Sequence, residues 1–445
     1  MTNSIQASYR RRFTSFCDKV AAMVLFIVAT CLFLACTHDD SDSAVETPDE
    51  RLAKSRTVMV YMIAENSLGG DELREDVREI IKGMNRLNLY AGDHLFLYVD
   101  DNGLPRIYEV KKDKSAALLT DLSPDYTYDR EENSASAAQL RSFIQYAKQY
   151  DSDSYGLVMW SHASGWIPST YEKDKVDVAT AKRRSFGIDN EQNSYSDRLN
   201  GHQMAIEDMA AVLADEFHDE GGLDFLFFDA CFMQCVEVDY ALRNVAKFIV
   251  ASPAEIPGPG ADYVTMVPAM FQQENYIQQM LSAYVVAYEK STEYGVIISS
   301  VETKYMESFA TQMRDIVQKY QSQLMSLDKQ GLLNYYVYGS WGKDFPDYLD
   351  MQGVMQVVLS EQEYEQWRTA LDAFVNCQTT NKWFAQNLGP YGQLVNVIPS
   401  QCSGVCMTIP FVAYASGTNR FDISFQDTEW AQAVWNSSTE ENEQQ

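Results

Sequence analysis

The sequence has few basic residues, and their scarcity excludes a large class of binding partner. Its 445 residues include 35 Lys and Arg against 63 Asp and Glu, which gives a formal net charge of −28 at pH 7. Nucleic-acid binding needs a clustered basic surface that neutralises phosphates. We therefore predict no nucleic-acid partner, and we interpret the charge as a solvated, acidic exterior.

The sequence also has no apolar run long enough to cross a membrane. Residues 21–35 form its most hydrophobic stretch, yet these 15 residues fall short of the roughly 20 that a spanning helix needs. Basic residues precede the stretch, as they do in a secretory signal peptide: Arg10, Arg11, Arg12 and Lys19. We predict that residues 1–35 are a signal peptide and not part of the fold.

The end of this stretch resembles the lipobox of bacterial lipoproteins. Residues 32–36 are Leu-Phe-Leu-Ala-Cys, with a small residue directly before the cysteine. The resemblance implies that Cys36 becomes the first mature residue and carries the lipid chains of a membrane anchor. The alternative is an ordinary secretory signal that is cut elsewhere.

The segment that begins at Cys36 is acidic. Residues 36–54 have little apolar surface to bury, so we predict a flexible tether. An acidic stretch directly after a lipidated cysteine resembles the signals that send some Gram-negative lipoproteins outward. We therefore expect a lipid anchor at the outer membrane or cell surface of a Gram-negative bacterium.

Cysteine is scarce, and its spacing excludes a structural zinc site. Of eight cysteines, three fall within the predicted signal peptide or directly after it, and five remain: Cys231, Cys235, Cys377, Cys402 and Cys406. No pair of them has the spacing of zinc ligands, so we predict no metal ligands in this chain. An odd number of thiols leaves at least one unpaired, which in an oxidising compartment is either buried or kept free for its chemistry.

What the sequence does contain is an alternation of buried strands with amphipathic helices. Hydrophobic residues make up 46% of the chain, enough for a large globular core. We predict strands over residues 57–63, 95–99, 106–110, 155–159, 223–228, 247–252 and 296–301, and helices over 73–84, 135–150, 206–217 and 232–243. This order predicts an α/β fold with a mostly parallel sheet, right-handed crossovers and helices on both faces. We assign residues 55–302 to one such domain.

The chain changes character beyond residue 302. A long amphipathic helix is predicted over residues 305–327, followed by aromatic-rich segments and a short strand at 404–409. We predict a smaller mixed α/β C-terminal region over residues 303–436 and a disordered tail at 437–445. Residues 167–200 are polar and charged, and there we predict a long loop.

Two chemically reactive side chains each follow one of the predicted strands. His162 comes after the strand at 155–159, and Cys231 comes after the strand at 223–228. In an open parallel sheet, active sites collect at the carboxyl ends of the strands. A free thiol is only a few per cent ionised at neutral pH, and a nearby imidazole raises its reactivity. We therefore predict a nucleophilic site in which Cys231 and His162 meet at one edge of the sheet.

The other histidines and the nearest cysteine suit these roles less well. None of His94, His202 and His218 ends a predicted central strand. Cys235 lies one helical turn beyond Cys231, which favours packing over a role as second nucleophile. His162 and Cys231 therefore stay the predicted pair.

The two motifs together resemble the clostripain family of cysteine peptidases, which share a caspase-like fold. Ser-His-x-x-Gly-Trp at residues 161–166 and Asp-Ala-Cys-x-Met at 229–233 follow hydrophobic strands in the family's order, and the similarity covers most of residues 57–263. The resemblance implies a caspase-like sheet, a protein or peptide substrate, Cys231 as nucleophile and His162 as base. It implies no required cofactor. Calcium dependence stays open, because calcium activates some relatives while no loop here has the ligand spacing of an EF-hand.

The chemistry of peptide hydrolysis adds two backbone groups to the predicted site. The oxyanion that forms when a thiolate attacks a carbonyl needs hydrogen-bond donors, each of which contributes about 3 kcal/mol. We expect these donors to be the backbone N–H groups of Cys231 and Ala163.

The resemblance also predicts a pocket for a basic P1 side chain. In this family an acid two residues before the nucleophile helps to bind Arg or Lys, and Asp229 matches it. A second acid commonly lies in a later turn, where this chain has Pro259, so Glu255 or Asp262 would have to compensate. We predict Asp229 and Glu255 as substrate-binding residues, together with Trp166, which is either a pocket wall or a core residue.

The segment between the two motifs contains a candidate site for cleavage of the chain. Many relatives are cut between the catalytic motifs, and the cluster Lys182, Arg183 and Arg184 is a candidate self-cleavage site or else a solvated basic patch.

The alternative function is a catalytically altered surface lipoprotein that binds peptide or glycan, since Pro259 changes the pocket.

Overall fold

The computed structural model describes residues 54–101, 103–168, 184–190, 201–336, 347–385, 392–410 and 425–436. The chain separates into two units, residues 1–52 and 53–445, and every described residue lies in the second. The predicted signal peptide, Cys36, nearly all of the tether and the C-terminal tail lie outside the described residues, as do Lys182 and Arg183. Among the helices of the described ranges, none is both long and apolar enough to span a bilayer.

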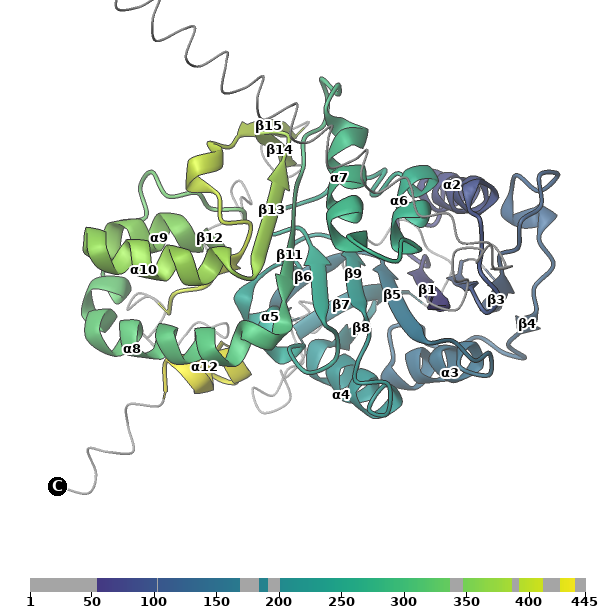
Figure 1. The fold of residues 1–445 in the computed structure, drawn as a ribbon, viewed down its shortest axis with the longest axis horizontal. Helices are drawn as coiled ribbons and strands as arrows, with labels where there is room; N and C mark the ends of the chain where they lie inside the picture. The colour runs from purple at the N-terminus through teal and green to yellow at the C-terminus, as the bar shows by residue number, and fades with distance from the viewer. Residues whose placement is uncertain are drawn as a thin grey trace, which may run out of the picture. The chain divides into compact units, whose positions relative to one another are not determined.

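A nine-stranded sheet forms the centre of the described unit (Figure 1). Its order is β13-β11-β10-β9-β5-β1-β2-β3-β4. The strands from β10 to β2 are parallel to one another, whereas the strands at both edges pair antiparallel. In chain order they are β1 (Arg56–Ile63), β2 (His94–Asp100), β3 (Arg106–Glu109), β4 (Tyr126–Thr127), β5 (Ser154–Trp160), β9 (Phe225–Asp229), β10 (Phe248–Ala251), β11 (Ile297–Glu302) and β13 (Val375–Thr379). The predicted α/β class is confirmed.

The central strands are buried on both faces, which is why they appear in the sequence as continuous apolar runs. Every residue of β1 is buried. Tyr61 and Ile63 belong to one core cluster, while Val60 and Met62 belong to the other, because successive side chains of a strand point to opposite faces. Both faces therefore need a layer of helices.

Helices cover both faces, as predicted (Figure 1). On the face of Val60 lie α2 (Asp71–Arg86), α6 (Tyr263–Met270) and α7 (Tyr276–Tyr288). On the face of Tyr61 lie α3 (Ala137–Ala147), α4 (Ile206–Glu216) and α5 (Val236–Ala241). Their apolar sides complete the two clusters and leave the loops at the strand ends to form a site.

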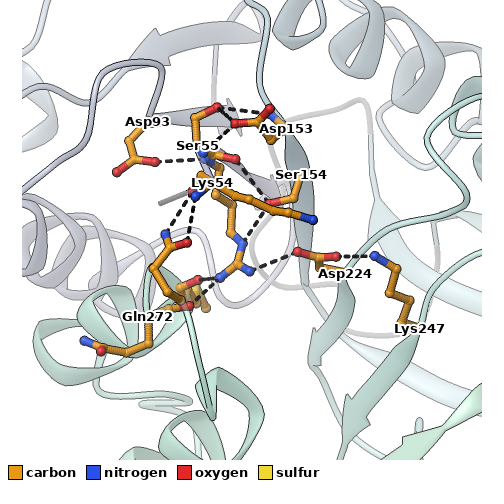
Figure 2. A network of polar contacts seen from close by, with 11 residues as sticks. Lys54, Ser55, Asp93, Asp153, Ser154, Asp224, Lys247 and Gln272 are labelled. Atoms are coloured by element: carbon orange, nitrogen blue, oxygen red, sulfur yellow. Dashed lines mark hydrogen bonds and ion pairs between the residues drawn. The ribbon is translucent and has the colours of Figure 1, made fainter. Parts of the chain in front are cut away.

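A buried polar network anchors the amino end of β1 (Figure 2). The guanidinium of Arg56 donates to the carbonyls of Met270 and Gln272 at 2.6 and 2.9 Å. It also donates to Asp224 at 2.9 Å, and Asp224 in turn accepts from Lys247 at 2.7 Å. The network therefore joins β1 to α6 and to the residue before β9, at the edge of the sheet opposite to His162 and Cys231.

We expect the change Arg56→Met to lower the free energy of unfolding by about 3 kcal/mol, because it removes the side-chain donor of two carbonyls and leaves the buried Asp224 carboxylate with Lys247 alone. Urea denaturation followed by circular dichroism measures this loss. Arg74→Met is the matched control, since Arg74 pairs with Asp71 on the exposed surface of α2, where a pair contributes about 0.5 kcal/mol. Equal losses in both variants would contradict the anchoring role.

One predicted helix begins too early. The sequence predicts a helix from residue 232, whereas α5 begins at Val236. Phe232 takes a left-handed backbone conformation with φ of 63°, and its amide donates to the Ala254 carbonyl at 3.0 Å. The chain after Cys231 is therefore held in an irregular turn by the neighbouring loop.

The predicted loop at 167–200 contains a strand that sequence analysis missed. β7 (Arg184–Asp189) lies between β6 (Ala163–Pro168) and β8 (His202–Ala205) in a small antiparallel sheet. Only Phe186 and Ile188 give β7 an apolar alternation, which is too short a pattern to recognise among charged neighbours. Arg184 of the predicted cleavage cluster is thus the first residue of a strand.

The C-terminal region adds helices and small sheets at one end of the central sheet (Figure 1). β13 belongs to this region by sequence, yet it pairs with β11 and extends the central sheet. The division at residue 302 stays a prediction, and the sheet is continuous across it. The remaining elements are η2 (Leu119–Asp121), η4 (Thr303–Tyr305), α8 (Met306–Met325), β12 (Leu349–Asp350), α9 (Met351–Val358), α10 (Glu361–Asp372), β14 (Lys382–Ala385), β15 (Gln393–Asn396), η6 (Pro399–Gln401), β16 (Cys406–Met407) and α12 (Glu429–Val434).

Candidate active site

The register of two neighbouring strands brings the predicted nucleophile and base to one edge of the sheet. β5 and β9 are parallel neighbours, and Trp160 is paired with Asp229. His162 lies two residues beyond Trp160, and Cys231 lies two residues beyond Asp229. Both side chains therefore leave adjacent strands at the same level, at the carboxyl edge where active sites of such sheets form.

His162 is half-buried and is contacted by a loop from the next strand. The hydroxyl of Ser67 lies 2.8 Å from Nε2 of His162. Ser67 follows β1, which is the other neighbour of β5. The backbone carbonyl of His162 accepts from Gly187 of β7 at 2.9 Å. A hydroxyl at Nε2 fixes the orientation of the ring, which is how a third group commonly supports a catalytic histidine.

The loop that carries Ser67 is held by Asn66. The Asn66 side-chain amide is buried and donates to the carbonyls of Ile63 and Ile188 at 2.9 and 2.8 Å, and to the Ser161 hydroxyl at 3.3 Å. These bonds tie β1, β5 and β7 together directly behind His162. Sequence analysis missed both residues, and the only available signal was their position just after a central strand.

Cys231 is half-buried, and its thiol is protonated at rest. Burial, followed by the charge of Glu255, raises the pKa of the Cys231 thiol to about 12, against the opposing effect of the Ile256 amide, which donates to Sγ at 3.4 Å. Ionisation of the thiol therefore needs a base to receive the proton. Glu255 is buried, and it is the predicted pocket residue whose charge acts most on Cys231.

Hydrogen bonds hold the backbone that follows the predicted nucleophile. The amides of Phe232 and Gln234 donate to Ala254 and Ser252, whereas the Cys231 amide has no such partner among the described residues. That N–H is available to an oxyanion. The second predicted donor, Ala163, begins β6 and is paired with Phe186.

Steric contacts explain why the first motif has glycine at position 165. Gly165 has φ of 66°, and a Cβ there would lie 2.7 Å from the Phe232 carbonyl oxygen and 2.6 Å from the Tyr348 hydroxyl. Only glycine fits this position without displacing the loop that follows the nucleophile.

Asp229, two residues before Cys231, is buried, and hydrogen bonds to it are found at only one of its two carboxylate oxygens among the described residues. Its Oδ2 accepts from the Ala261 amide at 3.1 Å and from the Tyr263 hydroxyl at 2.9 Å. Its Oδ1 is buried and has no hydrogen-bond partner within the described part of the chain. Burial raises the pKa of Asp229 to about 6, and the two hydrogen bonds limit the rise.

The turn that carries Pro259 packs directly on Asp229. A Cβ at Gly260 would lie 2.7 Å from Asp229 Oδ2, and the Gly260 carbonyl accepts from the Tyr288 hydroxyl at 2.5 Å. Asp262, one of the two acids considered as a replacement, caps α6 through the Val264 amide at 3.1 Å. Of the two, Glu255 is the acid whose charge acts on the thiol.

Two further side chains border Asp229 and were not predicted. Asp76 of α2 accepts from the indole N–H of Trp160 at 2.7 Å. Burial, followed by the charge of Asp229, raises the pKa of Asp76 well above its usual value. Tyr284 of α7 is buried, and its hydroxyl has no hydrogen-bond partner among the described residues. These residues lie on helices and carried no motif in the sequence.

The burial of Trp166 agrees with the interpretation as a core residue. Trp166 is fully buried, and its indole N–H donates to the Thr408 hydroxyl at 2.8 Å. Its ring packs edge-on against Phe425, with centroids 5.4 Å apart. It joins β6 to the C-terminal region, and none of these contacts involves a pocket.

Of the other histidines, one lies at the opposite edge of the central sheet and two are exposed. His94 is at the amino end of β2, where Nδ1 lies 2.7 Å from Glu109. His218 is exposed beside Asp219, and His202 is exposed on β8. Cys235 is buried, its thiol is free, and its backbone forms an isolated parallel β-bridge with the backbone of Cys406, which agrees with a packing role.

A family model describes nearly all of the unit that contains this site. The model of the clostripain family, Peptidase_C11, matches residues 60–428. The chain belongs to the clostripain family. Clostripain from Hathewaya histolytica is 27% identical over 230 residues, which are 46% of this chain. That match spans only 40% of the length of clostripain itself.

Solved structures of C11 proteases confirm the caspase-like fold of this clostripain-family chain. An inactive zymogen C11 protease from Parabacteroides distasonis has a TM-score of 0.69 at 26% identity and covers 86% of this chain and 98% of its own. A secreted C11 cysteine protease from Bacteroides thetaiotaomicron, in complex with an irreversible peptide inhibitor, has a TM-score of 0.67 at 28% identity and covers 86% and 99%. Catalysis in clostripain-family cysteine proteases needs no cofactor, because a thiol and an imidazole supply nucleophile and base.

Proposed function

We propose that this chain is a cysteine endopeptidase in which Cys231 attacks the peptide carbonyl and His162 moves the proton. The observation that carries the proposal is the pairing of Trp160 with Asp229, which aligns the two side chains at one sheet edge. The family membership and the inhibitor complex of the Bacteroides thetaiotaomicron relative support a peptide substrate.

The proposed reaction has two steps. In the first, His162 receives the Cys231 proton, Sγ forms a bond to the carbonyl carbon, and the amine leaves with a proton from His162. In the second, His162 takes a proton from water, the hydroxide attacks the thioester, and Cys231 is released as the thiol. The Cys231 amide stabilises the oxyanion in both steps. The raised pKa of Cys231 supports an ionisation that is coupled to a base, the role that we propose for His162.

We propose a basic P1 preference that rests on Asp229. Asp229 Oδ1 and the Tyr284 hydroxyl are buried polar atoms without partners among the described residues, as expected in a pocket that receives a polar side chain. Pro259 supplies no charge, and the charge of Glu255 acts on the Cys231 thiol, so Asp229 is the carboxylate that we assign to the P1 cation. One carboxylate suits a single guanidinium or ammonium group.

The sequence pattern supports two further parts of the proposal. We propose that Cys36 anchors the chain through lipid at the bacterial surface, and export agrees with the relative described as secreted. We also propose cleavage in the cluster that ends at Arg184, because a relative occurs as a zymogen. Both concern residues outside or at the border of the described ranges.

Digestion of a peptide library tests the activity. We expect the wild type to cut after Arg and Lys and the Cys231→Ala variant to cut nothing, since the nucleophile is lost. Cys377→Ala is the matched control, because Cys377 is also half-buried but lies on β13, away from the site. A wild type that binds library peptides without cutting them would favour the alternative, a surface lipoprotein that only binds.

A further inference from the structure

Two thiols outside the candidate active site lie in contact with each other. Sγ of Cys377 and Sγ of Cys402 are 3.9 Å apart, and both cysteines are free in the structure. Cys377 lies on the edge strand β13, whereas Cys402 directly follows η6 and lies in the loop that leads to β16. The two residues are 25 positions apart in the sequence. The fold therefore brings together two thiols that no local motif pairs.

The loop that carries Cys402 packs tightly against the sheet at this place. Gly404 has φ of 81°, and a Cβ there would lie 2.7 Å from both Cβ and Sγ of Cys377. The Gly404 carbonyl accepts from the Ser299 hydroxyl at 2.6 Å, and Ser299 is the residue of β11 that pairs with Cys377. Only glycine leaves room for the Cys377 side chain here, so the loop lies directly on the strand beside the two sulfurs.

Buried hydrogen bonds hold the same loop from its other side. The buried carboxylate of Asp350 accepts from the Ser403 amide at 2.8 Å, from the Ser403 hydroxyl at 3.0 Å and from the Tyr335 hydroxyl at 2.7 Å. The Tyr335 hydroxyl also lies 3.2 Å from Sγ of Cys402. Because groups on both sides hold Cys402 against β13, a bond between the two sulfurs needs little further ordering of the chain.

A disulfide bond fits this place after a small movement. Bonded sulfurs are about 2.0 Å apart, so each sulfur has to move by about 1 Å. β13 is an edge strand of the central sheet, and Cys377 on it is half-buried. A small oxidant can therefore reach the Cys377 sulfur, whereas Cys402 is buried behind it.

The other pair of neighbouring cysteines suits oxidation less well. Cys235 and Cys406 are joined by a backbone bridge, yet each of them is 0% exposed. The Cys406 thiol donates to the Gln234 carbonyl at 3.5 Å, so it already has a partner. Because an oxidant has to reach at least one of two sulfurs, we assign this pair to packing.

We propose that Cys377 and Cys402 form a disulfide bond that joins β13 to the loop before β16 when the chain is in an oxidising compartment. The oxidant is a low-molecular-weight disulfide or the disulfide of a thiol oxidoreductase. The Cys377 thiolate attacks one sulfur of the oxidant and releases one thiol, and Cys402 then attacks the Cys377 sulfur and releases the second. Two electrons pass to the oxidant, whose two sulfurs take up the two protons.

The bond changes which thiols of the chain are reactive. Among the five cysteines of the described ranges, Cys231 and Cys377 are half-buried and the other three are buried. Pairing of Cys377 with Cys402 therefore leaves Cys231 as the free thiol that reagents reach most readily. The presence of the bond in the cell rests on the export that we propose, whereas the capacity of the pure chain to form it does not.

Mass spectrometry of the full chain tests the bond without a peptidase assay. The Cys231→Ala chain is reduced and incubated with oxidised glutathione, and free thiols are blocked with an alkylating reagent before digestion with trypsin. An alkaline buffer is needed, because the hydrogen bond with Cys402, followed by burial, raises the pKa of the Cys377 thiol. Trypsin cuts at Lys382, between the two cysteines, so the bond appears as two linked peptides. We expect this link in nearly every chain, with fragment masses that place it at Cys402 and not at Cys406.

Thermal unfolding tests whether the bond stabilises the chain. The bond closes a loop of 25 residues, so we expect the oxidised chain to melt about 5 °C higher than the reduced chain. We expect no such difference between oxidised and reduced samples of Cys377→Ala or of Cys402→Ala. Cys406→Ala is the matched control, because it removes a buried cysteine four residues beyond Cys402 and leaves the pair intact. We expect this control to keep the difference.

Either of two results would overturn the bond. One is a Cys377 thiol that reacts with the alkylating reagent as fully after oxidation as before it, and the other is a link from Cys377 to Cys406. Equal melting temperatures of the linked and the reduced chain would overturn the stabilising role. Because the chain used has no Cys231 thiol, these results do not depend on peptidase activity, and the two proposals fail separately.

Discussion

The change His162→Ala is expected to lower kcat/KM by about a thousandfold, a loss of about 4 kcal/mol in transition-state stabilisation. Partial burial and the charge of Glu255 raise the pKa of the Cys231 thiol to about 12, so it depends on a base to a greater degree than an exposed thiol does. Initial rates on a fluorogenic peptide with Arg at P1 measure the effect.

The matched control for this loss is His94→Ala. His94 is also partly buried and also has a polar partner, Glu109, but it lies at the amino end of β2. We expect its replacement to leave kcat/KM within a factor of two. A His162→Ala variant that retains wild-type rates would show that another group receives the thiol proton.

The change Asp229→Asn is expected to lower kcat/KM for Arg and Lys substrates by 10² to 10³-fold while leaving substrates with Leu at P1 nearly unchanged. Removing the Asp229 charge leaves a bound cation without its proposed partner in a buried setting, which costs about 3–4 kcal/mol. Asp262→Asn serves as control, because Asp262 is close by but caps α6. If the ratio of Arg to Leu turnover stays the same, Asp229 does not select the P1 residue.

The pKa of Asp229 gives this prediction a pH dependence. Its carboxyl is raised to about 6, so it is charged above that pH and neutral below it. We expect KM for Arg substrates to rise as the pH falls through about 6, and KM for Leu substrates to stay level. The Asp229→Asn variant should lose this dependence. KM rises on acidification because only the ionised Asp229 carboxylate attracts the cationic side chain of the substrate.

The sequence was sufficient to predict the central sheet and to place His162 and Cys231 at the ends of two of its strands. His162 and Cys231 each follow a strand that is buried on both faces, so hydrophobic runs mark where each strand ends. The carboxyl edge of a parallel sheet then brings such residues together, whatever the loops do. Recognising the motifs required only local sequence.

The residues that sequence analysis missed depend on which strands are neighbours. Ser67 reaches His162 because β1 lies next to β5, and no local pattern contains that adjacency. Asp76 and Tyr284 approach Asp229 from helices that look ordinarily amphipathic. The helix predicted from residue 232 begins later in the structure, because the Phe232 amide donates to the Ala254 carbonyl in another loop. Tertiary contacts decided each of these cases.

Mapping of a covalent adduct tests the central claim, that Cys231 is the nucleophile beside His162, most directly. The wild-type chain is treated with an irreversible peptidyl inhibitor that has Lys at P1, and the modified peptide is identified by mass spectrometry. We predict one adduct per chain, located on Cys231, that forms about a thousandfold more slowly in His162→Ala. An adduct on Cys377, or on Cys231 at the same rate in both chains, would contradict the account.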